Sequence, residues 1–339
     1  MTWRTPTHWP SRAFPAWLWL PLVPVYWLGT TLQRWYQQRT PYRAPVPVIS
    51  VGNLTAGGSG KTPVVSAIAA YLSQQGYRVA IVGHGYQAAA TAPTLVTAEA
   101  DPRQVGDEAL ELAQSYCAAQ VWVGGGRRAC AAAATAAGAE VIILDDAFSH
   151  PYIARDLDLL VVDHHSAFGN RWLLPAGPLR EGLPAQHRAD AALVLGLQPG
   201  PLAALHIPQI PVRLVPSATL QGLPTKPVVA FCGLGLPDKF YRYLRAQGLS
   251  LAATHSFPDH HAYTAADGAA LAQLAARHHA VLVTTPKDAV KLKRDFAGDT
   301  PLYVVRPALA AADLLPLWAL VHKVLPPPVA PGIVAPATC

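Results

Sequence analysis

Residues 45–62 read PVPVISVGNLTAGGSGKT, and this stretch decides the fold. Its first half is a short apolar run that ends in turn residues at Asn53, which is the pattern of a buried strand. Its second half is rich in glycine and ends at Lys61 and Thr62. Residues 63–75 then repeat apolar side chains at helical spacing. A strand, a glycine-rich loop and a helix in this order predict a phosphate-binding loop, or P-loop.

The loop residues are of the types that a bound nucleotide requires. Glycines let successive backbone N–H groups turn inward onto phosphate oxygens, and a helix that begins near Lys61 adds its N-terminal dipole. Lys61 is expected at the β- and γ-phosphates, and the Thr62 hydroxyl on Mg²⁺. A glycine-rich turn with a solvated lysine is the plainer alternative, but the flanking strand and helix favour the P-loop. The candidate ATP-binding residues are Thr55, Ala56, Gly57, Gly58, Ser59, Gly60, Lys61 and Thr62.

A second apolar run, residues 141–146 (VIILDD), ends in two carboxylates. Ligands of open α/β sheets lie at the carboxyl ends of the strands, where Asp145 and Asp146 would emerge. In P-loop enzymes one such aspartate holds Mg²⁺. The alternative is a carboxylate that only caps the strand end, but the P-loop upstream favours the metal role.

Two further segments offer acid–base groups. One is Asp259-His260-His261 in a loop, and the other is Gly106-Asp107-Glu108 at the start of a helix. A histidine takes up a hydroxyl proton near neutral pH, and a carboxylate can orient it. Because adjacent residues of an extended segment point apart, His260 would need its partner from elsewhere. Asp107 is equally well read as a helix N-cap, and the histidines as solvated loop residues, so the residues alone leave this site open.

Strands alternate with helices along most of the chain, which predicts an α/β fold with a mostly parallel sheet covered on both faces. The last predicted helix, residues 308–324, contains Pro316, which should kink or interrupt it. The predicted organisation is an N-terminal membrane anchor (1–40), a P-loop core (41–205), a linker (206–227), a second α/β domain (228–325) and a disordered tail (326–339).

The composition favours contact with lipid and with acidic partners. Of the 339 residues 51% are hydrophobic and only 14% are charged, and the net charge is +6. Residues 14–32 carry no charge, and arginines flank them. Their length allows a transmembrane helix, but Pro15, Pro21 and Pro24 and the many tryptophans suit an interfacial anchor as well. A buried helix is the alternative. No basic run with interleaved aromatics indicates nucleic acid, and the four cysteines are expected to be reduced.

Seven segments resemble, in the same order, those of one family. They are Ser50–Pro63 (SVGNLTAGGSGKTP), Gly106–Glu108 (GDE), Leu144–His150 (LDDAFSH), Leu173–Glu181 (LLPAGPLRE), Phe231–Gly235 (FCGLG), Phe257–Thr264 (FPDHHAYT) and Thr284–Val290 (TTPKDAV). The family is tetraacyldisaccharide 4′-kinase, the membrane-associated enzyme that phosphorylates the lipid A precursor disaccharide. The fourth and sixth segments are far more specific than the P-loop itself. The family also begins its loop with a residue other than glycine, as Thr55 does here.

The resemblance implies a P-loop α/β core, a smaller second α/β domain and catalysis in the cleft between them. It implies transfer of the γ-phosphate of ATP to the 4′-hydroxyl of a tetraacylated glucosamine disaccharide 1-phosphate. The location implied is the cytoplasmic face of the bacterial inner membrane, held peripherally or by a single N-terminal span, with no obligate protein partner. The implied catalytic residues are Asp107, His260 and Lys61. The implied metal ligands are Thr62, Asp145, Asp146 and Glu181, and the implied substrate contacts are Tyr86, His150, Asn170 and Arg180.

The chain departs from the family pattern in three places. It has Gly83-His84-Gly85-Tyr86 where the family usually has Ser-Arg-Gly-Tyr, Gly124-Gly125-Gly126-Arg127 for Gly-Arg-Asp-Arg, and Phe148-Ser149-His150 for Phe-Gln-His. Two expected arginines are therefore absent, and neither histidine nor glycine replaces an arginine that clamps a phosphate or sugar. The missing arginines predict altered binding of the acceptor. Two alternatives stay open: a membrane-associated P-loop NTPase switch without a lipid acceptor, and a weakly active or non-catalytic homologue.

Overall fold

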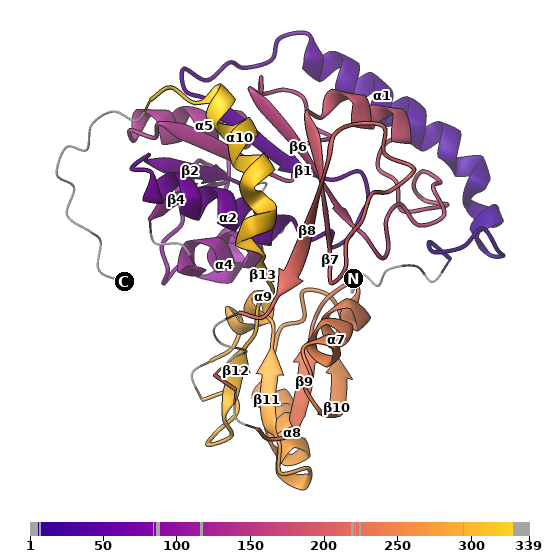
Figure 1. The fold of residues 1–339 in the computed structure, drawn as a ribbon, viewed down its shortest axis with the longest axis vertical. Coiled ribbons are helices and arrows are strands. Elements are labelled where there is room, and N and C mark those ends of the chain that lie inside the picture. The colour runs from indigo at the N-terminus through magenta and orange to yellow at the C-terminus, as the bar shows by residue number, and fades with distance from the viewer. Residues whose placement is uncertain are drawn as a thin grey trace. The chain divides into compact units, whose positions relative to one another are not determined.

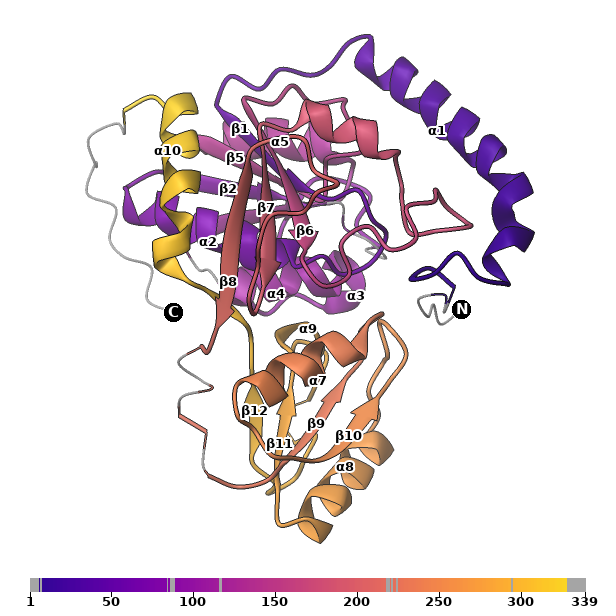
Figure 2. The same ribbon diagram turned by 45° about the vertical axis from the view of Figure 1, so that its right-hand side comes forward.

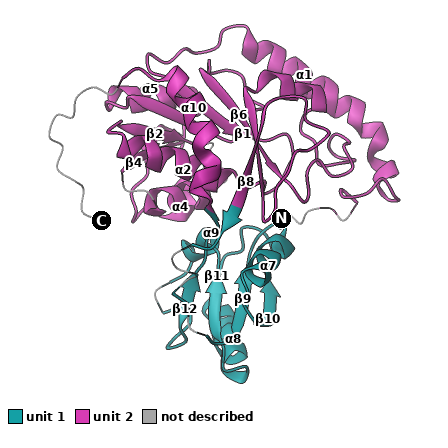
Figure 3. Cartoon of the chain, in the orientation of Figure 1, with its two compact units in different colours: residues 1–5, 214–308 teal, residues 6–213, 309–339 magenta. Residues whose placement is uncertain are grey.

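The computed structural model describes residues 6, 8–83, 85, 89–115, 118–217, 220, 222, 223, 225–293 and 295–327. The chain divides into two compact units (Figure 3). Unit 1 comprises Met1–Thr5 and Leu214–Ala308, and unit 2 comprises Pro6–Arg213 and Leu309–Cys339. Each unit has its own sheet and its own apolar core. The predicted α/β fold with a second, smaller α/β unit is confirmed.

Unit 2 is built on a nine-stranded sheet in the order β13-β8-β7-β6-β1-β5-β2-β4-β3 (Figure 1). The pairs from β8 to β4 are parallel, and β3 runs antiparallel to β4. The strands are β1 (Val48–Gly52), β2 (Val79–Val82), β3 (Thr94–Leu95), β4 (Ala119–Val123), β5 (Val141–Asp145), β6 (Leu157–Asp163), β7 (Ala191–Gly196), β8 (Gln209–Val215) and β13 (Ala308–Leu309). The buried strands β1, β5 and β6 are continuous apolar runs, as expected for a parallel sheet covered on both faces.

Helices cover this sheet on both sides, with α5 behind the strands and α2 in front (Figure 2). The helix α5 contributes small side chains to a core cluster with β2 and β5, which lets helix and sheet approach closely. The helices of unit 2 after the N-terminal segment are α2 (Lys61–Gln74), α3 (Pro102–Val105), α4 (Asp107–Ser115), α5 (Arg127–Ala136) and α10 (Leu315–Val324), with short 3₁₀ turns at Leu183–Arg188 and Ala311–Leu314.

Unit 1 is a smaller sheet of four parallel strands in the order β10-β9-β11-β12. Its core is formed by aromatic and aliphatic side chains around Phe231, which contacts the rings of Phe257, Tyr263 and Phe296. The elements are β9 (Val228–Cys232), α7 (Pro237–Ala246), β10 (Leu251–Ser256), α8 (Ala265–Arg277), β11 (Val281–Thr284), α9 (Pro286–Ala289) and β12 (Leu302–Val304).

The N-terminal apolar run is divided by its prolines into a 3₁₀ helix, η1 (Ala16–Leu22), and an α-helix, α1 (Val23–Gln38). Pro21 lies inside η1 and Pro24 in the first turn of α1. In the part of the chain that the structure describes, no helix combines the length and the hydropathy needed to cross a bilayer. No residue of α1 is buried.

Several segments differ from the sequence-based expectation. Residues 209–215, inside the predicted linker, form β8 beside β7. Residues 251–256, for which no strand was predicted, form β10 at the edge of the smaller sheet. The predicted helix 308–324 starts later, because 308–309 form β13 and the regular helix begins only at Leu315, with Pro316 in its first turn. This helix, α10, belongs to unit 2, although the predicted second domain (228–325) included it. Most of the predicted tail, residues 328–339, lies outside the described residues.

Candidate active site

The P-loop connects β1 to α2 at the carboxyl end of a central strand. Gly57 and Gly60 have φ angles of 105° and 88°, in the left-handed region that residues with a Cβ rarely adopt. The side-chain nitrogen of Asn53, just after β1, donates to Ser59 Oγ at 2.9 Å, and both side chains are buried. This hydrogen bond connects Ser59, near the end of the loop, to the residue that follows β1, and it fixes the curvature of the loop.

Residues 173–181 support the P-loop from outside. The Ala56 N–H donates to Pro178 O, and the Arg180 N–H donates to Leu54 O, both at 2.7 Å. Between these bonds Thr55 and Leu179 form an antiparallel bridge. The LLPAGPLRE segment is therefore a short partner strand of the loop, and this pairing brings the Arg180 side chain to the nucleotide site.

Asp146 is the centre of a charged cluster at the end of β5. Its carboxylate accepts from the Arg180 guanidinium at 2.9 and 3.0 Å, and Lys61 Nζ lies 3.4 Å from Oδ1. Burial alone would raise the pKa of Asp146, but Lys61 and Arg180 outweigh it and hold the pKa well below its usual range. The carboxylate is therefore ionised at all physiological pH values. Three predicted site residues, Lys61, Asp146 and Arg180, are in direct contact.

Asp145 lies in a different environment, although it is the next residue. It is the last residue of β5, in register with Val51 of β1, and it is 7% exposed. Burial, together with the Glu108 carboxylate, raises the pKa of Asp145 to about 7. Its buried Oδ1 accepts no hydrogen bond from any described residue. A carboxylate oxygen in that state suits a cation, because a metal ion would satisfy it and restore the ionised form.

The pKa of Asp145 predicts a pH-dependent effect of Asp145→Asn on stability. A carboxyl whose folded pKa is raised weakens the fold increasingly as pH rises from its unfolded pKa near 4 to its folded pKa near 7. The neutral amide avoids this cost. We therefore expect Asp145→Asn to raise the melting temperature of the nucleotide-free protein at pH 8 and to leave it almost unchanged at pH 4. Calorimetry across this range checks the prediction, and a uniform shift at all pH values would contradict it.

Arg127 organises the turn that carries both aspartates. It is 2% exposed, and its guanidinium donates to the backbone carbonyls of Asp145 and Asp146 at 2.9 and 2.7 Å. A third bond, of 3.2 Å, reaches the Tyr152 hydroxyl. Sequence reasoning missed this role. The available signal was an arginine that begins a helix directly after three glycines.

One departure from the family pattern has a packing reason. Gly125, which stands where an arginine was expected, has a φ of 62°, and an added Cβ would come within 2.8 Å of the Pro93 ring. Gly124 is packed still more closely, because an added Cβ would come within 2.3 Å of the Ala92 carbonyl oxygen. The loop around residue 92 therefore fills the space that a side chain at 125 would need. The departure at His84 and the predicted substrate residue Tyr86 both lie outside the described residues.

Glu181 is a buried carboxylate held by two arginines. Its side chain is 3% exposed and pairs with Arg188 at 2.8 and 3.0 Å. Arg34 of helix α1 lies 2.6 Å from the same carboxylate, and the Tyr26 hydroxyl of that helix donates to the Arg180 carbonyl at 3.1 Å. The predicted metal role of Glu181 stays a prediction. In this structure its oxygens bind arginines, one of them from the N-terminal helix.

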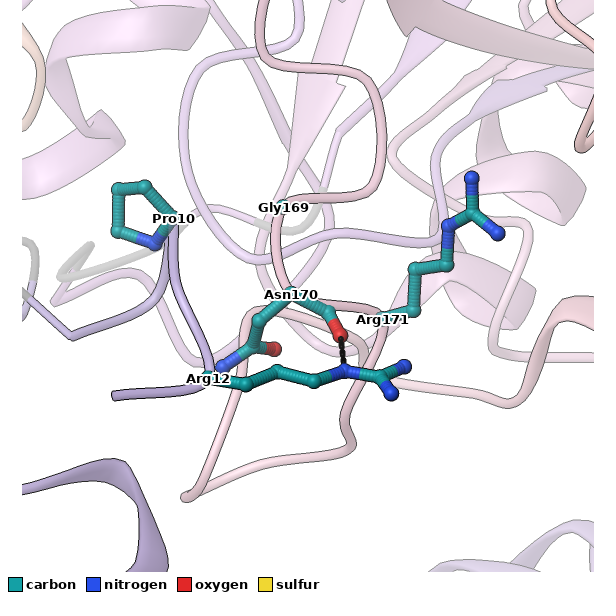
Figure 4. A pocket seen from close by; sticks show the side chains of 5 residues that line it. All are labelled: Pro10, Arg12, Gly169, Asn170 and Arg171. Atoms are coloured by element: carbon teal, nitrogen blue, oxygen red, sulfur yellow. Dashed lines mark hydrogen bonds between the residues drawn. The ribbon is translucent and has the colours of Figure 1, made fainter. Parts of the chain in front are cut away.

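Asn170 and His150, both predicted to contact the substrate, hydrogen-bond to neighbouring segments of the chain. Asn170 is 5% exposed, and its amide nitrogen donates to the carbonyls of Ser11 and Ala176 at 3.1 and 3.0 Å. It also lines an open hollow of about 330 Å³ with Pro10, Arg12, Gly169 and Arg171 (Figure 4). His150 is partly buried, and its carbonyl accepts from Arg155 at 2.8 Å. Substrate contact by either residue stays a prediction.

The two predicted acid–base residues belong to different units. Asp107 begins α4 in unit 2, directly after Gly106, whose φ is 89°. His260 lies in unit 1, in the loop between β10 and α8, and has a φ of 57°. Lys287 Nζ lies 3.4 Å from His260 Nε2 and 3.0 Å from Asp259 Oδ1. The neighbouring His261 instead bonds Asp267 at 3.1 Å and stacks on Phe257, so only His260 is placed beside Lys287.

The P-loop lies between a parallel strand and a helix, and the acidic end of the neighbouring strand contacts the loop lysine. This arrangement defines a nucleotide-dependent phosphotransferase or NTPase of the P-loop class. A family model described as "Tetraacyldisaccharide-1-P 4'-kinase" matches residues 15–323. The chain belongs to this kinase family. The resemblance predicted from the seven segments is confirmed.

Individual relatives agree over nearly the whole chain. It is 43% identical over 313 residues to the tetraacyldisaccharide 4′-kinase of Gluconacetobacter diazotrophicus, with 90% of each chain covered. It is 40% identical over 332 residues to that of Methylobacterium sp. (strain 4-46), covering 95% of this chain and 96% of the relative. The structure of LpxK from Aquifex aeolicus in complex with ATP has a TM-score of 0.71 at 27% identity, covering 90% of this chain and 98% of that one. These kinase relatives do not favour the NTPase switch.

Proposed function

We propose that this chain transfers the γ-phosphate of ATP to the 4′-hydroxyl of a tetraacylated glucosamine disaccharide 1-phosphate, in the biosynthesis of lipid A. The observation that carries the proposal is the contact of Lys61, Asp146 and Arg180 beside a P-loop, in a chain that matches the kinase family from residue 15 to residue 323. The relatives named above are tetraacyldisaccharide 4′-kinases.

In the proposed reaction the P-loop amides and Lys61 hold the triphosphate. The Lys61 ammonium lies 3.4 Å from Asp146 Oδ1, at the end of the loop where the γ-phosphate would lie. Thr62, Asp145 and Asp146 present a hydroxyl and two carboxylates, the donors that Mg²⁺ takes together with water and phosphate oxygens. Mg²⁺ would neutralise charge that develops on the transferring phosphoryl group. Arg180 would keep Asp146 oriented toward this site.

On the acceptor side, His260 and Asp107 are proposed to act together. His260 takes the proton of the 4′-hydroxyl, and Asp107 stabilises the imidazolium that forms. The partly buried position of His260 supports this role, because a base shielded from water interacts more strongly with its partners. Within the FPDHHAYT segment, His260 is accompanied by the Asp259 carboxylate and by the ammonium of Lys287, 3.4 Å from its Nε2.

A lipid phosphorylation assay tests the proposal. The purified full chain would be incubated with ATP labelled at the γ-phosphate and a tetraacylated glucosamine disaccharide 1-phosphate in detergent micelles. Labelled lipid that migrates as the bisphosphate, and that loses its label to a 4′-phosphatase, is the expected product. ATP turnover without labelled lipid would overturn the proposal and favour the switch.

The N-terminal segment is proposed to hold the enzyme on the cytoplasmic face of the inner membrane, where the acceptor's acyl chains reside. Its apolar side chains face solvent in large number, and flanking arginines suit anionic headgroups. So many large exposed apolar side chains in one segment mark an interaction site. The exposed residues are Phe14, Trp17, Leu18, Trp19, Leu20, Leu22, Val25, Trp27, Leu28, Leu32, Trp35 and Tyr36.

Replacing two of these side chains should release the protein from vesicles. Trp17 and Trp27 are 63% and 52% exposed, and each would bury its ring at the lipid interface. We expect Trp17→Ala/Trp27→Ala to lower the bound fraction on vesicles containing phosphatidylglycerol by about 10-fold or more, measured by co-sedimentation. The control is Leu315→Ala, an apolar residue of α10 that is 67% exposed. Equal release by the control, or no release by the double variant, would place the attachment surface elsewhere.

A further inference from the structure

Resting on the proposed role of His260, we propose that Lys287 is a positioning residue for this histidine. Lys287 lies on the short helix α9, in the segment TTPKDAV, and its partner was not predictable from the sequence. Its ammonium lies 3.0 Å from Asp259 Oδ1 and 3.4 Å from His260 Nε2. It thereby contacts two adjacent residues, Asp259 and His260, which lie 28 and 27 positions before it in the chain.

His260 needs such a support because its backbone is strained. Its φ of 57° lies in the left-handed region, which is costly for a residue with a Cβ. Its N–H donates to Asp259 Oδ1 at 3.1 Å, the same oxygen that Lys287 contacts. One carboxylate oxygen therefore binds both the backbone of His260 and the ammonium that contacts its ring. The three side chains are only 15–19% exposed, so solvent screens these charges incompletely.

Lys287 itself is held by the core of unit 1. The helix α9 begins at a cap in which Thr285 Oγ1 accepts from the Asp288 N–H at 3.2 Å and donates to Asp288 Oδ2 at 2.7 Å. Asp288 is fully buried, accepts from the Gly233 N–H at 3.0 Å and pairs with Lys291. This anchoring fixes the backbone that carries Lys287. The buried Asp288 therefore fixes the helix that carries Lys287, and the Lys287 ammonium in turn fixes the loop of His260.

The contact also selects a form of the imidazole. A lysine ammonium has donors and no acceptor, so its approach to Nε2 requires a lone pair there. The same lone pair would take the proton of the 4′-hydroxyl, so Nε2 exchanges the ammonium for the hydroxyl when the substrate enters. Lys287 then holds the loop through Asp259 Oδ1, the oxygen that also accepts from the His260 N–H.

The test compares Lys287→Met with Lys287→Arg and with the control Lys293→Met, an exposed lysine of the same unit. The full chain is assayed in the lipid phosphorylation assay described above. We expect Lys287→Met to lower kcat by about 10- to 100-fold, because small displacements of a reacting group have effects of this size, and to change KM for ATP less than twofold. Lys287→Arg should recover part of the loss. Lys293→Met should match the wild type. A kcat of Lys287→Met within twofold of the wild type overturns the proposal.

A double variant separates positioning from direct contact with substrate. If Lys287 acts through His260, then adding Lys287→Met to His260→Ala lowers single-turnover rates no further than His260→Ala alone. A further drop of the size seen in the wild-type background shows that Lys287 acts on substrate, and it overturns the positioning role. If Lys287→Met does not fold, as judged by its thermal unfolding, Lys287→Gln takes its place in both comparisons.

Failure of the proposed function gives a different result. A fully active His260→Ala variant would mean that His260 is not the base, whatever Lys287 does. An inactive His260→Ala together with a fully active Lys287→Met would remove only the positioning role.

Discussion

Lys61→Ala is expected to lower kcat/KM for lipid phosphorylation by roughly 10²–10³-fold, the usual effect of removing one group that stabilises transition-state charge. Lys61 lies at the first position of α2, directly after the last glycine of the loop. Its ammonium is 3.4 Å from Asp146 Oδ1, so the substitution also leaves Asp146 with Arg180 as its close cationic partner. The loss should therefore appear both in the rate of transfer and in the affinity for ATP.

Initial rates with γ-labelled ATP, together with calorimetric titration of ATP, check this result. The matched control is Lys323→Ala, an exposed lysine in the last turn of α10. This variant removes the same charge from the same unit, far from the P-loop in the sequence. It should leave both kcat/KM and the affinity for ATP unchanged. An unchanged kcat/KM for Lys61→Ala would mean that the P-loop does not hold the transferred phosphate.

His260→Ala should produce a loss of comparable size with a different signature. General-base catalysis contributes about 10²–10⁴-fold, so kcat should fall by that amount. Because His260 lies outside the P-loop unit, the affinity for ATP should change little. Single-turnover rates and ATP titrations on the same preparations measure the two quantities separately.

The adjacent histidine supplies the control for this variant. His261 bonds Asp267 at the start of α8 and stacks on Phe257. His261→Ala should therefore lower the free energy of unfolding and have only a small effect on kcat. A parallel fall in kcat for His260→Ala and His261→Ala would mean that the loop as a whole, and not one imidazole, is required. A large loss of ATP affinity in His260→Ala would contradict its placement on the acceptor side.

The P-loop half of the fold was predictable because its signals are local. The strand Val48–Gly52, the glycines and the helix from Lys61 follow one another in the chain, and each has a strong pattern. The strand β10 was missed because its sequence, LAATHS, is half polar and lies at a sheet edge. The strand β13 was missed because alanine and leucine at 308 and 309 look like the start of the helix that follows.

The candidate site was predictable where a local sequence motif contains the residues and unpredictable where a residue acts through partners distant in the chain. Lys61, Asp146 and Arg180 were identified, and they are in contact. Arg127 and Lys287 were not identified, because their partners are backbone carbonyls or side chains from distant segments. Asn170 was predicted to contact the substrate, but its buried amide donates to backbone carbonyls and thereby supports the shape of a loop.

The ion pair between Arg34 and Glu181 has a practical consequence for anyone who shortens this chain to obtain a lipid-free enzyme. A deletion up to residue 40 removes the exposed apolar surface, but it also removes one of the two cations beside a carboxylate that is 3% exposed. An under-compensated buried charge is strongly destabilising, and Glu181 follows directly after the arginine that holds Asp146. An inactive truncated enzyme would therefore confound loss of lipid attachment with a disturbed ATP site. Polar substitution of the apolar side chains with Arg34 retained separates the two causes.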